Sequence, residues 1–319
     1  MTRLRSLGWR RALLPILVVG AACERAREVP SNDTAIPTPS PPESVVTLPA
    51  PVAAAWDSAA GPALIVAGNT PHDAFIIIPA YTDTMTLDTA QFELGAIRGS
   101  RIDLFSRGRL AGEARLASAV AGTTTAGACT SWPTARLEPL DRSASVPSWT
   151  VGFAAGRASP IVVDSIEGLE AADSSKLAIA VARLASALPG DTAPAFRGLP
   201  FVVRRVHRFR VEDADVLVAE VIRKVNLEAN PRQEQLFIIA ERDSGSTTPR
   251  YEAAYVERVS GPEETLEATE LLAVVTIGTR RRPTVVIGRD FGDGVSYTLV
   301  ERQGRKRWRA RWSSAYAGC

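Results

Sequence analysis

The sequence predicts a strand-rich α+β fold, in which a mixed N-terminal part with one clear helix precedes an antiparallel β-meander. Apolar residues recur at helical spacing within 173–190, and eight apolar runs joined by short polar breaks fill 201–312. Several of these runs alternate apolar and polar residues, as half-buried strands do. We therefore divide the chain into residues 1–22, 23–61, 62–197 and 198–319.

Residues 1–22 have the layout of a secretory signal peptide. Four arginines, the last of them Arg11, precede an apolar stretch from Ala12 to Ala22. That stretch is too short to span a bilayer, which needs roughly 20 residues. We expect the chain to be exported and to contain no transmembrane helix.

Small residues stand directly before the first cysteine. Gly20, Ala21, Ala22 and Cys23 form a run that resembles the lipobox of bacterial lipoproteins, although Gly20 stands where that family usually has leucine. The resemblance implies lipidation of Cys23, and Glu24 after it implies the outer membrane in a cell that has one. The alternative is ordinary cleavage after an alanine, which leaves a soluble secreted protein.

Residues 23–61 are expected to form a disordered tether. Pro, Ser and Thr dominate 30–51, and large apolar residues are scarce there. Such a segment buries too little apolar surface to offset its ordering entropy, and its prolines favour a semi-rigid, extended spacer. A linker without any anchor has the same composition.

Residues 62–197 mix strands with the one clear helix. Strands are expected at 63–68, 74–79 and 147–156, with a hairpin over 100–116 whose tip is Arg107-Gly108 and a loop-rich stretch over 122–145. In the helix, Leu177, Val181, Leu184 and Leu188 share one face. Asp173 or Ser174 would cap its start, and Pro189-Gly190 would end it.

Residues 198–319 are expected to form the antiparallel strands. The eight runs cover 201–211, 215–226, 234–242, 250–259, 270–278, 282–289, 295–302 and 306–312. Tyr297 and Leu299 are expected to face one way and Val300 the other. Trp308 and Trp312 have even spacing, which predicts that they share a face.

The hairpin over 271–294 resembles the calcium hairpin of FG-GAP repeats, the unit of integrin-type β-propellers. Thr276, Gly278, Arg280 and Thr284 fall where that family places its acidic ligands. Calcium needs six to eight oxygen ligands, and the arginines at 280–282 would repel it. We expect a hairpin without metal, whose arginines either meet solvent or contact an acidic partner or lipid headgroups.

The cysteine count and the net charge further narrow the class of protein to which this chain can belong. With Cys23 lipidated, Cys129 and Cys319 remain as a disulfide candidate in an oxidising compartment; two free thiols are the alternative. The formal net charge of +2 would fall to about −2 without the leader, and such a balance argues against a nucleic-acid partner.

No catalytic residue, cofactor site or metal site is predicted. The two histidines, His72 and His207, lie far apart, and no nucleophile elbow or phosphate-binding loop is present. The basic run 204–210 around His207 reads as a solvated strand face. The predicted function is a binding or structural role in a cell-envelope lipoprotein, with the membrane and an envelope protein or polysaccharide as partners. The alternative is a secreted hydrolase with dispersed acidic residues.

Overall fold

The computed structural model describes residues 64–77, 94–122, 129–141, 143–189, 194–225, 231–245, 250–278 and 280–319. All of them belong to one of the two structural units of the chain, Leu48–Cys319. The predicted signal peptide, the tether and the lipidation site Cys23 lie outside the described residues, so they stay predictions. None of the helices in the described ranges is long and apolar enough to cross a bilayer.

The first strands close into a barrel in the order β1-β2-β5-β4-β3-β6. The barrel consists of β1 (Leu64–Ala67), β2 (Asp73–Ile77), β3 (Arg101–Ser106), β4 (Arg109–Val120), β5 (Thr134–Pro139) and β6 (Val151–Ala154), with the short α1 (Leu94–Ile97) beside β4. Closure pairs Ile65 with Gly152, where a Cβ would lie 2.8 Å from the Ile65 side chain. Strand β5 occupies part of the stretch 122–145 that was predicted to be loop-rich, because its alternating residues Ala135 and Leu137 face the barrel core.

Two antiparallel sheets follow, which we call the helix-side sheet (β12-β11-β10-β9-β8) and the central sheet (β16-β15-β14-β13-β7). Their strands are β7 (Ala158–Pro160), β8 (Asp164–Ser165), β9 (Val202–Val211), β10 (Ala214–Val225), β11 (Arg232–Asp243), β12 (Glu252–Pro262), β13 (Ala268–Ile277), β14 (Arg282–Asp290), β15 (Gly294–Gly304) and β16 (Arg307–Ser313), with β17 (Ala317–Gly318) beside β15. Short 3₁₀ turns are η2 (Ile166–Gly168), η3 (Pro194–Phe196) and η4 (Glu263–Thr265). The strand-rich class with one long helix is confirmed, and all eight predicted runs are strands.

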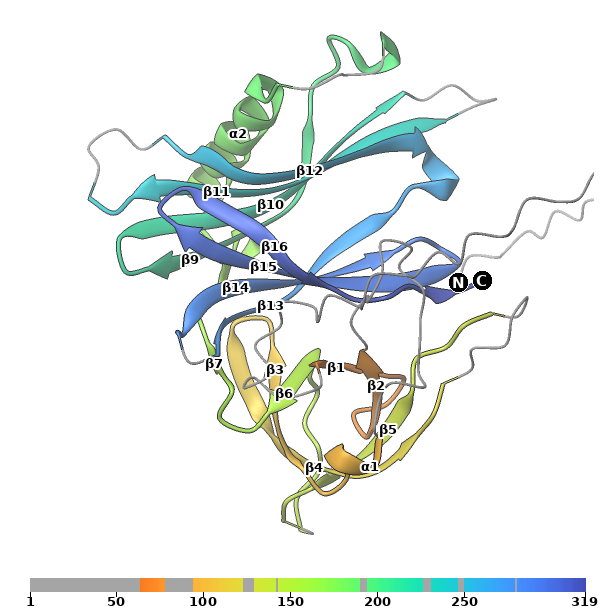
Figure 1. The fold of residues 1–319 in the computed structure, drawn as a ribbon. Helices are drawn as coiled ribbons and strands as arrows, with labels where there is room; N and C mark the ends of the chain where they lie inside the picture. The colour runs from red at the N-terminus through yellow and green to blue at the C-terminus, as the bar shows by residue number, and fades with distance from the viewer. Residues whose placement is uncertain are drawn as a thin grey trace, which may run out of the picture. The chain divides into compact units, whose positions relative to one another are not determined.

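The central sheet lies between the barrel and the helix-side sheet (Figure 1). It has a hydrophobic core on each face. On one face, residues such as Val275 and Leu299 pack against Phe105 and Phe153 of the barrel. On the other, Val274 and Val300 are among the residues that pack against the helix-side sheet. The opposite orientation of Leu299 and Val300 is the one that the sequence predicts.

Helix α2 (Ala171–Ala187) covers the outer face of the helix-side sheet with Leu177, Val181 and Ala185. The predicted helix is confirmed, but it starts earlier than expected. Glu170 occupies the N-cap position without a side-chain cap, so the prediction that Asp173 or Ser174 caps the helix is wrong.

Trp308 and Trp312 face different cores, so the prediction that they share a face is wrong. Trp308 packs between the two sheets, whereas Trp312 packs on the barrel side of the central sheet. Leu299 pairs with Trp312 and Val300 with Ala310, which leaves Arg311 as an extra residue. This β-bulge reverses the alternation between the two tryptophans.

A disulfide joins Cys129 to Cys319, as the sequence predicts, across a separation of 190 residues and with Cα atoms 4.3 Å apart. The Thr130 N–H donates to the Gly318 carbonyl over 2.8 Å, and the Cys319 N–H donates to the Asp293 carbonyl over 2.8 Å. The bond and the Thr130 contact fasten residues 318–319 to the segment that leads into β5, and the Asp293 contact fastens Cys319 to the β14–β15 turn.

Candidate anion-binding site

Strand β9 carries the basic run that the sequence singles out. Its arginines Arg204, Arg205 and Arg210 are exposed, as predicted, but Arg208 is partly buried. Val206, His207 and Phe209 are buried. Phe209 faces the core between the two sheets, while Val206 faces α2. Since side chains alternate along a strand, Arg208 and Arg210 lie on the α2 side of the helix-side sheet.

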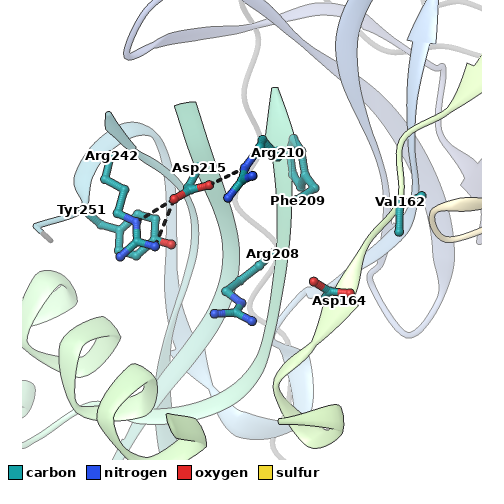
Figure 2. A pocket seen from close by; sticks show the side chains of 8 residues that line it. All are labelled: Val162, Asp164, Arg208, Phe209, Arg210, Asp215, Arg242 and Tyr251. Carbon is teal, nitrogen blue, oxygen red and sulfur yellow. Dashed lines mark hydrogen bonds and ion pairs between the residues drawn. The ribbon is translucent and has the colours of Figure 1, made fainter. Parts of the chain in front are cut away.

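A row of three charged residues crosses this face. Asp215 on β10 pairs in register with Arg210 on β9 and with Arg242 on β11. The Arg210 Nε donates to Asp215 Oδ1 over 3.0 Å, and the Arg242 Nε donates to Asp215 Oδ2 over 3.0 Å. Figure 2 shows the carboxylate between the two guanidinium groups. The ladder register therefore places one cation on each side of the Asp215 carboxylate.

Electrostatics keep Asp215 ionised. Burial by itself would raise the pKa of this carboxyl group, but hydrogen bonds and charge from Arg210 and Arg242 outweigh it. The net result is a pKa below the ordinary value of 3.8. A carboxylate that stays charged holds both guanidinium groups in place at neutral pH.

Tyr251, just before β12, forms an apolar wall beside Arg242. The Arg242 guanidinium lies over the Tyr251 ring, 5.0 Å from its centroid. Burial raises the pKa of the Tyr251 hydroxyl, so this group is neutral and can donate a hydrogen bond at physiological pH. Stacking also fixes the plane in which Arg242 presents its remaining N–H donors.

Arg208 completes the site and differs from the other two arginines. It is partly buried and pairs in register with Asp164 of β8, yet it forms no ion pair with any residue that the structure describes. The cavity beside it measures about 390 Å³. Its lining residues, drawn in Figure 2, are Val162, Asp164, Arg208, Phe209, Arg210, Asp215, Arg242 and Tyr251. We call this cavity the arginine pocket.

The arginine pocket combines charged donors with apolar walls. Three guanidinium groups and two carboxylates line the pocket. Two of these guanidinium groups already donate hydrogen bonds to Asp215. The uncompensated Arg208 can take a carboxylate or phosphate in a bidentate geometry. Ligand cavities of a few hundred Å³ with a few convergent polar groups are typical of small-molecule sites.

His207 lies in a second cavity of about 430 Å³, which we call the histidine cavity. Ser106, Ser165 and Glu270 are among the residues that line it. The ring is only 6% exposed, and its Nδ1 has no hydrogen-bond partner among the described residues. Burial lowers the pKa of His207, with a contribution of the same sign from the charge of Arg107. His207 is thus a buried neutral residue, not the surface residue that the sequence suggests.

The remaining residues singled out in the sequence lie elsewhere. The His72 Nδ1 lies 3.0 Å from the Leu137 carbonyl in the barrel, far along the chain from His207. Thr276 and Arg282 belong to the β13–β14 hairpin, as predicted, and Arg282 pairs with Glu301 over 2.7 Å. Within the described ranges, no cluster of three or more His, Cys, Asp or Glu side chains could hold a metal ion.

Sequence reasoning missed Asp215, Arg242 and Tyr251. One signal was present: a two-residue turn at 212–213 would place Arg210 and Asp215 opposite each other.

No protein-family model, curated protein or solved structure matches this chain.

Proposed function

We propose that this protein is an exported, lipid-tethered binding protein that holds a small organic anion in the arginine pocket. One observation carries the proposal: Arg208 is a partly buried cation that forms no ion pair with any described residue, and it lies beside two guanidinium groups that Asp215 holds in place. The predicted signal peptide, Cys23 and the proline-rich tether support the location at a membrane of the cell envelope.

An anion would satisfy the charge that the fold leaves uncompensated. Removing a cation from water without pairing it is unfavourable, so a carboxylate or phosphate that pairs with Arg208 gains more than a surface ion pair would. The Tyr251 ring offers apolar contact to the rest of the ligand. The favoured ligand is therefore a small anion with an apolar or aromatic body.

A calorimetric titration with phenyl phosphate and benzoate tests the pocket. Arg208→Gln should weaken the binding of whichever probe binds by roughly ten- to a hundredfold, because it removes a charge-assisted hydrogen bond. Arg197→Gln, an exposed arginine outside the pocket, serves as the matched control and should leave the affinity unchanged. Failure of both anions to bind the wild-type chain, or equal affinity of the two variants, would refute the proposal.

The tether is tested separately, by mass spectrometry of the mature N-terminus. A diacylglycerol group on Cys23 is the expected result. A mature chain that begins near Cys23 without lipid would leave a soluble secreted binding protein, whereas an uncut leader would remove the export proposal altogether.

The hydrolase alternative has two local observations in its favour. In the histidine cavity, His207 shares the lining with Ser106 and Ser165, but no described hydrogen bond joins the ring to either hydroxyl. Elsewhere, Glu257 and Glu267 come together, but both pair with Arg289, which marks them as an ion-pair network. Labelling of Ser106 or Ser165 by a fluorophosphonate would favour the hydrolase over the binding protein.

A further inference from the structure

One end of the central sheet gathers an excess of positive charge in three turns. These turns follow β6, join β13 to β14, and join β15 to β16. In Figure 1 the β13–β14 and β15–β16 turns both lie on the left of the molecule. We call this set the basic end; its cationic residues are Arg157, Arg280, Arg281, Arg282, Arg305, Lys306, Arg307 and Arg309.

Strand register brings these turns together. The Gly278 N–H donates to the Arg157 carbonyl over 3.2 Å, which places the turn after β6 against the β13–β14 turn. Strands β14, β15 and β16 are neighbours, and Arg309 pairs in register with Glu301, which in turn pairs with Thr284. The positive charges thus belong to one surface and not to separate parts of the fold.

Five of the eight cations of the basic end have no carboxylate partner among the described residues. Arg282 pairs with Glu301, Arg305 with Asp243, and Lys306 with Glu252. The Arg281 guanidinium donates to the Ser159 hydroxyl over 3.0 Å. In the part of the chain that the structure describes, five exposed arginines of the basic end form no ion pair: Arg157, Arg280, Arg281, Arg307 and Arg309.

The excess charge is not cancelled locally. The carboxylates at this end are Asp103, which accepts from the Gly156 N–H over 2.7 Å, the partners Asp243, Glu252 and Glu301, and the two partners of Arg302, Asp213 and Glu241. With Arg302 counted, nine cations against six carboxylates leave a local charge of about +3. The whole chain without its leader is close to neutral, so the positive charge is concentrated on this surface.

The basic end is also where the first described strand begins. Ile65 of β1 pairs with Gly152 of β6, and β6 runs in the direction of Arg157. Since β1 is antiparallel to β6, Leu64 lies toward the end of β6 that leads into the basic end.

We propose that the basic end docks on the anionic headgroups of the membrane to which the chain is tethered. The choice of a bilayer as the partner rests on the tether in the proposed function. Guanidinium groups bind phosphates in a bidentate geometry, and juxtamembrane cations are attracted to anionic lipid surfaces.

Vesicle sedimentation tests this contact independently of the lipid anchor. The full chain with Cys23→Ser, which cannot carry a lipid there, is mixed with vesicles of phosphatidylcholine alone or with about a third phosphatidylglycerol. We expect binding to the anionic vesicles only, and weaker binding as salt rises from about 50 to 500 mM. The triple variant Arg157→Gln, Arg280→Gln, Arg307→Gln should bind the anionic vesicles about a hundredfold more weakly.

A second triple variant provides the matched control. Arg136→Gln, Arg183→Gln, Arg197→Gln removes the same charge outside the basic end and should bind as the parent chain does. Equal thermal unfolding of the two triple variants shows that both are folded. Equal weakening by both variants, or binding to soluble polyphosphate but not to vesicles, would overturn the membrane proposal while leaving the arginine pocket and the Cys23 result untouched.

Discussion

Trp308 donates a hydrogen bond from its indole Nε1 to Glu241 Oε1 over 2.6 Å, and so links the central sheet to the helix-side sheet. Glu241 is fully buried, and it also accepts from Arg302 over 2.7 Å and from the Lys306 N–H over 2.7 Å. A buried carboxylate with this many donors is stable only as a complete network.

The Glu241 network makes the fold sensitive to acid. Burial would raise the pKa of Glu241, but the donors outweigh it, and the pKa lies below the ordinary value of 4.5. Because the folded pKa is depressed, the stabilisation is complete above about pH 4.5 and is lost as the pH falls through the folded pKa. Glu241→Gln should lower the free energy of unfolding in urea by about 3–5 kcal/mol at pH 7. The difference from wild type should shrink at pH 3; an equal difference at both pH values would contradict the assignment.

His207 should add a separate dependence at higher pH. Its folded pKa is depressed by burial, so the unfolded chain binds a proton first as the pH falls below about 6.5. Stability from this residue is therefore complete above about pH 6.5 and is lost as the pH falls from 6.5 toward the lower folded pKa. Urea unfolding at pH 7.5 and 5.5 should show a loss in wild type that His207→Gln reduces. A loss of the same size in the variant would show that another group titrates.

The two tryptophans of β16 should act independently. They lie in different cores, so Trp308→Phe and Trp312→Phe should add in a double variant to within about 0.5 kcal/mol. Trp308→Phe should be the costlier change, by about 1–3 kcal/mol, because it leaves buried Glu241 short of one donor. Chemical denaturation of the two single variants and the double variant measures both quantities. Strong coupling would mean that the tryptophans contact a common core.

The Cys129–Cys319 disulfide should contribute substantially to stability. Closing a loop of 190 residues is worth up to about 5 kcal/mol in the chain-entropy model. The double variant Cys129→Ser, Cys319→Ser should unfold at lower urea, and dithiothreitol should bring wild type to the same midpoint. The reductant should not affect the double variant, which serves as the control. No change in wild type on full reduction would show that the bond adds nothing.

Strands and turns could be predicted from the sequence because their signals are local. The eight runs after residue 201 are bounded by short polar breaks, and the hairpin tip at Arg107-Gly108 was recognised in the same way. The closed barrel could not be predicted, because β1 pairs with β6 across most of the N-terminal part. Such pairings depend on long-range geometry that no local pattern records.

The faces of individual side chains were predictable only where the ladder is regular. Leu299 and Val300 were placed correctly, whereas the extra residue Arg311 reversed the expected face of Trp312. The arginine pocket was missed for a related reason. Asp215 and Arg242 are 27 residues apart, and only the register of β10 against β11 brings them together.

The two-sided burial of the central sheet has a consequence for how the fold responds to heat. The barrel and the helix-side sheet each need the same strands as the opposite wall of their core. Melting either neighbour would strip apolar cover from β13–β15, so partial melting is disfavoured and residues 64–319 should melt cooperatively. A single calorimetric transition whose van't Hoff and calorimetric enthalpies agree is the expected signature, and two separate transitions would contradict it.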